Sequence, residues 1–180
     1  MDVFRDNFRS VSDCLHDQMT KIIFILRHAQ SAGKQSGQHD YDRILTPHGQ
    51  AEARAQGIIF IEKNYFPDLI LCSASTRTRQ TLALFNESTM IPPEKIQFRE
   101  DFYDALMFHL LDTTEKLPDD ISKVMYIGHN PGLSLFASDL CANFIDLATS
   151  QLVAYEFNTE TWKELNGPGK EILNLKSHPN

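Results

Sequence analysis

Three short segments of the chain place arginine or histidine side chains directly after apolar runs. They are IFILRHAQS at residues 23–31, CSASTRTRQT at residues 72–81 and YIGHNPG at residues 126–132. The guanidinium group of an arginine presents a planar fork that matches two phosphate oxygens at once. A helix start, which Ser73 is placed to cap in the second segment, adds free backbone N–H groups and a positive dipole end. These residue types in this pattern indicate a site for an anion such as phosphate.

Each segment also has an ordinary structural explanation when it is taken alone. An Arg-His pair such as Arg27-His28 arises easily by chance. Arg77 and Arg79 would be unremarkable on a solvated helix, and His129 would more often be structural than catalytic. However, each segment follows an expected strand, and open α/β sheets bind their ligands beyond the carboxyl ends of their strands. The sequence therefore predicts one polar site to which all three strand ends contribute.

The elements that must position these residues are short apolar runs with the length of buried strands. They lie at Lys21–Leu26, Asp68–Cys72, Ile96–Phe98, Lys123–Ile127, Leu152–Phe157 and Ile172–Leu175. Helical patterns lie between them, and three of these begin with capping signals at Thr46-Pro47, Ser73 and Asn130-Pro131. The alternation predicts a three-layer α/β/α fold, with helices on both faces of a mostly parallel sheet.

The last two expected strands lie close together in the sequence. They are joined by NGPG at residues 166–169, which predicts an antiparallel hairpin at one edge of the sheet. Their connection contains the only tryptophan, Trp162, which we expect to be a packing residue. Since the chain has no internal repeat and no Gly/Ser linker, we expect a single domain over residues 19–180 after an extension at residues 1–18. Met19 stands just before the first strand and could be the true start.

Composition limits the classes of function. The 180 residues carry a net charge of −7, which argues against nucleic acid as a partner, because such binding usually needs a basic surface. No apolar run reaches the roughly 18 residues that a membrane helix needs, so we expect no membrane partner. Cys14, Cys72 and Cys141 form no CxxC pair, and a reducing, cytoplasmic location is expected. Neither a dense carboxylate cluster nor an HxxxH spacing is present, so we expect no metal or other cofactor.

Five segments in order resemble the signature segments of a known family. The segments are LRHAQS, DRILTPHGQAEA at residues 42–53, SASTRTRQT, EDFYDA at residues 100–105 and IGHNPG. They resemble the histidine phosphatase superfamily, the phosphoglycerate-mutase-like group. The resemblance runs from about Lys21 to the end of the chain, and it implies the phosphoglycerate-mutase-like form of the α/β fold.

The resemblance implies roles for the residues at the strand ends. His28 matches the nucleophilic histidine that is transiently phosphorylated, while Arg27, Arg77 and His129 match the residues that hold the phosphoryl oxygens. These roles agree with elementary chemistry, because a neutral imidazole is a competent nucleophile near pH 7. Fixed donors also stabilise the charge that spreads over the equatorial oxygens during phosphoryl transfer.

The remaining candidate residues surround this group. Glu100 matches the family's proton donor, although Tyr103 and Asp104 lie close enough in the sequence to be alternatives. Ser31 and Arg43 are expected to contribute to substrate binding, with the alternative that Arg43 only braces the loop in which it lies.

The length of one connection bears on the substrate. Only 22 residues separate Ala105 from Gly128, where many relatives carry a long insertion that covers the substrate. The pocket is therefore expected to be shallow and open, as in the compact SixA-type branch, whose members act on phosphohistidine. The expected partner is a phosphorylated protein bearing phosphohistidine. The alternatives are a small phosphate ester as substrate, and a non-catalytic module that binds phosphate or a phosphoprotein.

Overall fold

A single six-stranded sheet forms the middle layer of the protein. The computed structural model describes residues 20–165 and 167–176, so the predicted extension at residues 1–18 lies outside the described residues. The strands are β1 Thr20–Arg27, β2 Leu69–Ser73, β3 Ile96–Arg99, β4 Lys123–Gly128, β5 Leu152–Asn158 and β6 Lys170–Leu175. Their order is β3-β2-β4-β1-β5-β6. β1 to β4 run parallel, and β5 pairs antiparallel with both β1 and β6, which confirms the predicted sheet and its antiparallel edge.

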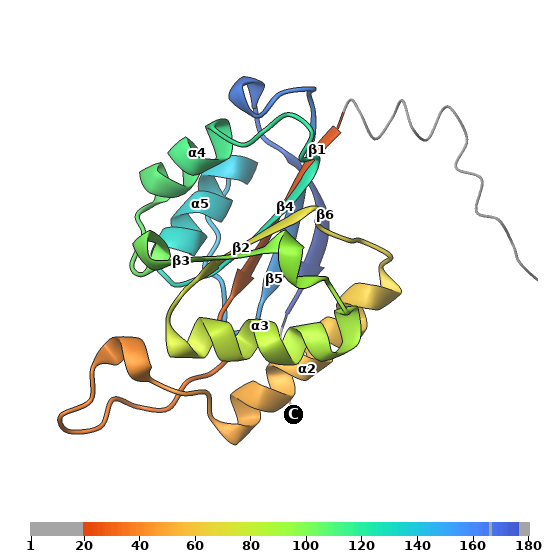
Figure 1. Ribbon diagram of the computed structural model, residues 1–180. Helices are drawn as coiled ribbons and strands as arrows, with labels where there is room; N and C mark the ends of the chain where they lie inside the picture. The colour runs from red at the N-terminus through yellow and green to blue at the C-terminus, as the bar shows by residue number, and fades with distance from the viewer. Residues whose placement is uncertain (1–19, 166, 177–180) are drawn as a thin grey trace, which may run out of the picture.

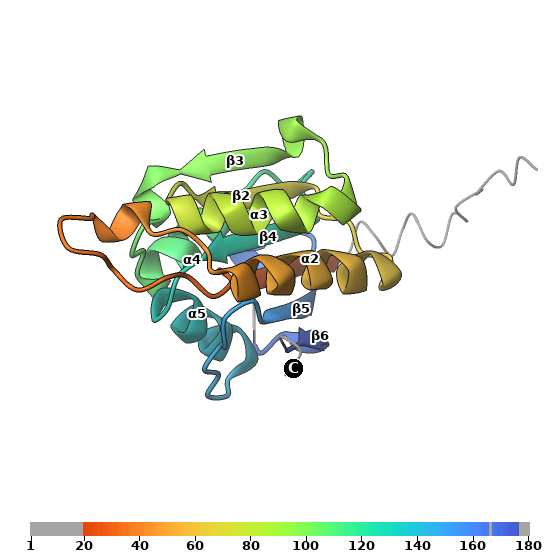
Figure 2. The same ribbon diagram turned by 90° about the horizontal axis from the view of Figure 1, so that it is seen from below.

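Helices cover both faces of the sheet, as predicted (Figures 1 and 2). Helices α2 Pro47–Glu62 and α3 Thr76–Thr89 lie on one face. Helices α4 Met107–Glu115 and α5 Gly132–Cys141 lie on the other face. Each face therefore has its own apolar core. No helix in the described ranges is long and apolar enough to span a membrane.

The central strand β1 shows why its sequence is a continuous apolar run. Its side chains alternate between the two cores: Ile23 and Ile25 pack under α4 and α5, and Ile22 and Phe24 pack under α2 and α3. A strand that is buried on both faces has no polar positions to alternate with. The first residue that escapes full burial is Arg27, at the carboxyl end of the strand.

One of the three expected helix caps forms as predicted. Thr46 Oγ1 accepts a hydrogen bond of 3.0 Å from the backbone N–H of Gly49, at the start of α2. The expected cap at Asn130 is wrong, because α5 begins at Gly132. Instead of capping the helix, the Asn130 amide donates to the backbone carbonyl of Leu147 at 3.1 Å.

The expected cap at Ser73 is also wrong. Ser73 is the last residue of β2, and α3 begins three residues later at Thr76. Ser75 holds the cap position, but its hydroxyl bonds the hydroxyl of Thr78 at 2.8 Å and caps no backbone N–H. The hydroxyl of Ser73 contacts His129 on the neighbouring segment instead, so a non-local partner decides its role.

The short connection between β3 and β4 packs against the fold on one side. Its helix α4 contacts α5 and the short 3₁₀ helix η4 Trp162–Glu164. Gly132 permits a close approach, because a Cβ atom at this position would collide with the backbone carbonyl of Ala105. Trp162 is fully buried in the same core and donates from Nε1 to the carbonyl of Ile121 at 2.8 Å, which confirms it as a packing residue.

Candidate active site

The carboxyl ends of β1, β2 and β4 bring the three arginine- and histidine-bearing segments to one edge of the sheet. Arg27, the last residue of β1, is in register with Gly128, the last residue of β4. The backbone N–H of His28 donates to the carbonyl of Gly128 at 3.1 Å. As a result, the rings of His28 and His129 lie side by side with their centroids 5.2 Å apart. The long loop that follows β1 leaves from this same edge (Figure 2).

His28 is held with one ring nitrogen free. Its Nδ1 lies 2.8 Å from the backbone carbonyl oxygen of Ala29. Since a carbonyl oxygen only accepts hydrogen bonds, Nδ1 must carry the hydrogen, and Nε2 of the neutral ring keeps its lone pair. This ring is therefore oriented as a nucleophile that would attack from Nε2.

Burial keeps both rings neutral. The pKa of His28 is lowered to about 4, mainly because burial disfavours the charged ring. The hydrogen bond to Ala29 opposes this shift, while the charges of Arg77, Arg27 and Arg43 reinforce it. Burial and the charge of Arg77 lower the pKa of His129 to about 3. His28 is thus unprotonated, and able to attack an electrophile, at neutral pH.

Three buried donors at this edge have no protein acceptor in the described part of the chain. They are Nε of Arg27, Nε of Arg77 and Nδ1 of His129, once that nitrogen carries the ring hydrogen. One terminal nitrogen of each arginine is held by a backbone carbonyl: Arg27 Nη1 donates to that of Leu147 and Arg77 Nη1 to that of Asp40, each at 2.6 Å. Buried polar groups are nearly always hydrogen-bonded. An oxyanion beside His28 would supply the acceptors that these groups lack.

Asp40, which was not among the predicted site residues, is a central contact of the site. Its carboxylate accepts from Arg77 Nη2 at 3.0 Å, from Arg43 Nη1 at 2.9 Å and from the Tyr103 hydroxyl at 2.9 Å. The hydrogen bond from Arg43 is the largest of several effects that hold the pKa of this carboxyl well below its usual range. Asp40 is therefore ionised at neutral pH, and it fixes the terminal nitrogens of Arg77.

Arg43 and Ser31 lie in the loop that carries Asp40. Arg43 donates from Nε to the Ala32 carbonyl at 2.8 Å and from Nη2 to Ser31 Oγ at 2.9 Å. Of the two roles expected for Arg43, these contacts support bracing of the loop. Its charge also reaches the site, because it helps to lower the pKa of His28.

The three candidate proton donors differ in their positions. Glu100 is exposed, and its carboxylate accepts from the Tyr41 hydroxyl at 2.6 Å. Asp104 is exposed as well. Tyr103 lies beside two of the buried donors: its ring centroid is 5.5 Å from that of His129 and 5.8 Å from the guanidinium carbon of Arg77. Burial and Asp40 raise the pKa of Tyr103, so its hydroxyl keeps its proton at neutral pH.

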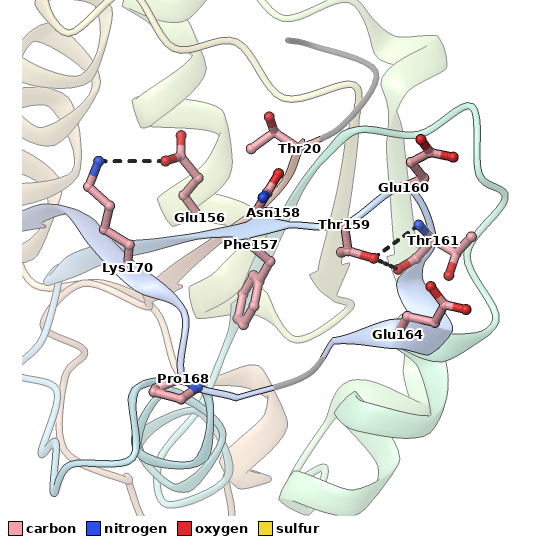
Figure 3. Close-up of a pocket in the computed structure, with 10 residues that line it drawn as sticks. All are labelled: Thr20, Glu156, Phe157, Asn158, Thr159, Glu160, Thr161, Glu164, Pro168 and Lys170. Carbon is pink, nitrogen blue, oxygen red and sulfur yellow. Dashed lines mark hydrogen bonds and ion pairs between the residues drawn. The ribbon is translucent and has the colours of Figure 1, made fainter. Parts of the chain in front are cut away.

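A second hollow lies at the opposite end of the sheet and does not resemble an anion site. It adjoins Thr20, the first residue of β1, and Figure 3 shows the carboxylates of Glu156, Glu160 and Glu164 around it. Its lysine, Lys170, is paired with Glu156 at 3.7 Å. Over the described ranges, no group of three or more His, Cys, Asp or Glu side chains is placed to hold a metal ion.

The low pKa values of the two histidines predict a loss of stability in mild acid. Unfolded imidazoles take up protons near pH 6.5, whereas His28 and His129 resist protonation to about pH 4 and 3. The unfolded state therefore binds more protons in this window, and the free energy of unfolding falls as the pH is lowered. The expected loss between pH 7 and pH 5 is about 2 kcal/mol for each histidine.

Urea denaturation at pH 7 and pH 5 measures this loss. His129→Asn should reduce the difference between the two pH values by about half, because an amide side chain does not titrate. A variant with the pH dependence of the wild type would contradict the low pKa of His129.

Comparisons with known proteins agree with the fold. A family model described as the histidine phosphatase superfamily (branch 1) matches residues 23–122. An uncharacterized chloroplastic protein of Arabidopsis thaliana is 32% identical over 175 residues, covering 89% of this chain and 80% of that protein. The structure of a putative phosphohistidine phosphatase SixA from Agrobacterium tumefaciens has a TM-score of 0.74 at 26% identity, covering 86% of this chain and 97% of that one. A second, from Nakamurella multipartitia, has a TM-score of 0.75 at 23% identity, covering 88% and 96%.

Proposed function

The chain belongs to the histidine phosphatase superfamily, and we propose that it hydrolyses phosphohistidine in proteins through a phosphorylated His28. The observation that carries the proposal is the juxtaposition of the neutral His28 ring, whose Nε2 keeps its lone pair, with three buried donors that lack acceptors among residues 20–165 and 167–176. Arg27, Arg77 and His129 supply those donors. A tetrahedral phosphoryl group would satisfy them while it presents its phosphorus atom to His28.

The reaction would proceed in two displacements. In the first, Nε2 of His28 forms a bond to phosphorus while the P–N bond to the substrate imidazole breaks, and the departing ring takes up a proton from solvent. In the second, the oxygen of a water molecule forms a bond to phosphorus and the P–N bond to His28 breaks. Inorganic phosphate leaves, the proton of the water passes to phosphate or solvent, and neutral His28 is restored. The fixed donors stabilise the charge on the equatorial oxygens in both steps.

The acidic groups of the site favour an imidazole leaving group over an alkoxide. An alkoxide is strongly basic and needs a general acid, whereas an imidazole leaves readily because its conjugate acid has a pKa near 7. Asp40 contacts Arg77 but is ionised at neutral pH, so it has no proton to give. Glu100 bonds Tyr41 at the exposed rim. Tyr103 remains the nearest group with a proton, and a phenol is a weak acid.

The short connection between β3 and β4 supports a substrate presented by another protein. Its one helix, α4, packs against α5 and η4. It therefore leaves no long segment to cover His28, as a pocket for a small free substrate would require. The SixA structures that this fold matches are described as putative phosphohistidine phosphatases, which adds support to the same substrate class.

The proposal is tested by comparing two kinds of substrate. A protein carrying phosphohistidine and a set of simple sugar phosphates are offered at equal concentration, and release of inorganic phosphate is measured. We expect kcat/KM for the phosphohistidine protein to exceed that for every sugar phosphate by at least about tenfold, because Tyr103, the nearest group with a proton, is a weak acid for an alkoxide leaving group. A preference for an ester would assign the site to a small-molecule phosphatase.

A binding module without turnover is the other outcome that this experiment can identify. Such a module would bind phosphate but release none from either class of substrate. Trapping of the phosphoenzyme then distinguishes an enzyme from a binding module, because a catalytic His28 must acquire phosphate from an activated donor such as a phosphoramidate. If no phosphoenzyme formed with any donor, the chain would be assigned to phosphate or phosphoprotein binding.

We further propose that residues 19–180 form one catalytic domain and that it acts in a reducing compartment such as the cytoplasm. The six strands share one sheet, which supports a single domain. Cys72 is buried and Cys141 is partly buried, and both are free thiols. Thiols of this kind are typical of proteins from reducing compartments.

A further inference from the structure

A set of buried hydroxyl groups lies behind His129. Oγ of Ser73 is 2.9 Å from Nε2 of His129, and Oγ of Ser75 is 3.4 Å from the same nitrogen. Both serines are fully buried, and His129 is 6% exposed. The other ring nitrogen, Nδ1, has no partner in the part of the chain that the structure describes. The two nitrogens of this ring are therefore in different surroundings.

The hydroxyl hydrogens of the neighbouring residues can be assigned one by one. Thr78 Oγ1 lies 2.7 Å from the Ser73 carbonyl oxygen, which can only accept. Thr78 thus uses its hydrogen there and can accept one from Ser75, whose Oγ is 2.8 Å away. That leaves the hydroxyl hydrogen of Ser73. Among the described residues, its one acceptor within hydrogen-bond distance is Nε2 of His129.

The two neutral forms of His129 differ in how well they complete this network. With the ring hydrogen on Nε2, that nitrogen would donate to Ser73, and the buried hydroxyl hydrogen of Ser73 would have no acceptor. With the ring hydrogen on Nδ1, Nε2 accepts from Ser73 and every hydroxyl hydrogen has a partner. Among the described residues, the first form leaves two buried groups unpaired, the hydroxyl hydrogen of Ser73 and the lone pair of Nδ1, whereas the second leaves only the Nδ1–H group. An unpaired buried polar group is costly, so the second form is preferred.

We propose that Ser73 is a positioning residue that fixes His129 as the tautomer with its hydrogen on Nδ1. The role rests on the proposed function, in which His129 helps to hold the phosphoryl group. In this tautomer Nδ1 is a hydrogen-bond donor that an oxyanion can satisfy. In the other tautomer Nδ1 would present a lone pair, which repels a phosphoryl oxygen. Ser73 therefore acts through His129 and touches no reacting atom.

The tautomer can be read directly from nitrogen chemical shifts. In protein labelled with ¹⁵N-histidine at pH 7, long-range ¹H–¹⁵N spectra distinguish a ring nitrogen that carries hydrogen from one that does not. We expect Nδ1 of His129 to be the protonated nitrogen and Nε2 the bare one, with the signals assigned by their loss in His129→Asn. A wild-type spectrum with the hydrogen on Nε2 would overturn the proposal without any variant at the serine.

Two matched variants then test the role of Ser73. Ser73→Ala should turn the preference toward the Nε2–H form, which can still donate to Ser75 Oγ at 3.4 Å. Inorganic phosphate must then bind the minor Nδ1–H form, so its affinity should fall roughly tenfold. Ser75→Ala removes an equally buried hydroxyl two residues further along the chain, but it should leave the tautomer unchanged and phosphate binding within about twofold. The same tautomer and phosphate affinity in Ser73→Ala as in the wild type would refute the role.

Neither readout requires turnover. If Nδ1 carries the hydrogen and Ser73→Ala changes it, but no substrate is hydrolysed, the proposed function fails and the role of Ser73 stands. If a phosphohistidine protein is hydrolysed but Ser73→Ala does not change the tautomer of His129, the proposed function stands and the role of Ser73 fails.

Discussion

His28→Ala is expected to reduce turnover of a phosphohistidine protein by about 10⁴-fold or more, the scale typical of the loss of a nucleophile. Direct attack by water on the substrate would be the only route left, because the neighbouring ring of His129 has its Nε2 bonded to Ser73. The arginine donors would remain in place, so the variant should still bind inorganic phosphate. Turnover would be lost in a protein that still recognises its product.

The fold of this variant should be intact. His28 belongs to a polar site rather than to either apolar core. The lowered pKa of its buried ring destabilises the fold in mild acid, so the variant should lose less free energy of unfolding at low pH than the wild type does. Urea denaturation at pH 7 should give a midpoint close to that of the wild type. Residual turnover near the wild-type level would exclude His28 as the nucleophile.

A trapping experiment separates loss of the nucleophile from a general defect. A phosphoramidate donor should label the wild type with an acid-labile phosphate on the peptide that contains His28, and it should leave His28→Ala unlabelled. His109→Ala is a matched control, because His109 lies on α4 and bonds Asp101 at 2.9 Å, away from Arg27, Arg77 and His129. This control should be labelled and should turn over as the wild type does.

The sequence allowed the sheet and the convergence of three strand ends to be predicted because both follow from local patterns. A strand buried on both faces is apolar where it crosses the core, as β1 is from Ile22 to Leu26, and a charged pair such as Arg27-His28 is expected only where the strand leaves the core. The carboxyl ends of parallel neighbours then meet at one edge. These regularities require no knowledge of which loop contacts which.

Asp40 and Ser73 could not be assigned from the sequence because their partners are non-local. Asp40 lies in a polar loop, and its role depends on how that loop folds back to Arg77, 37 positions along the chain. Ser73 has the residue type of a helix cap, and only its distance to His129, 56 positions away, shows a different use. The candidate acids near residue 100 pose the same problem. The sequence does not show that the ring of Tyr103 lies against His129 while the carboxylate of Glu100 bonds Tyr41.

Arg77→Ala is expected to weaken the binding of inorganic phosphate about 10- to 10²-fold, the usual cost of a lost hydrogen bond to a charged group. Arg77 is 4% exposed, and its Nε is one of the three buried donors without a protein acceptor among the described residues. Its loss also leaves the Asp40 carboxylate without one of its cationic partners, so an uncompensated negative charge would lie beside the anion site. Both effects act against an incoming phosphate.

Arg79→Ala is the matched control from the same helix. Arg79 donates from Nε to the Ala74 carbonyl at 2.7 Å, and its guanidinium carbon lies 4.1 Å from the centroid of the Phe98 ring. It is thus committed to packing, and its loss should change phosphate affinity by no more than about twofold. Inhibition of turnover by inorganic phosphate measures both variants. Arg77→Lys, which keeps the charge but loses the planar fork, should fall between them. Equal losses in Arg77→Ala and Arg79→Ala would show that general positive charge on α3, rather than the one buried guanidinium, holds the phosphate.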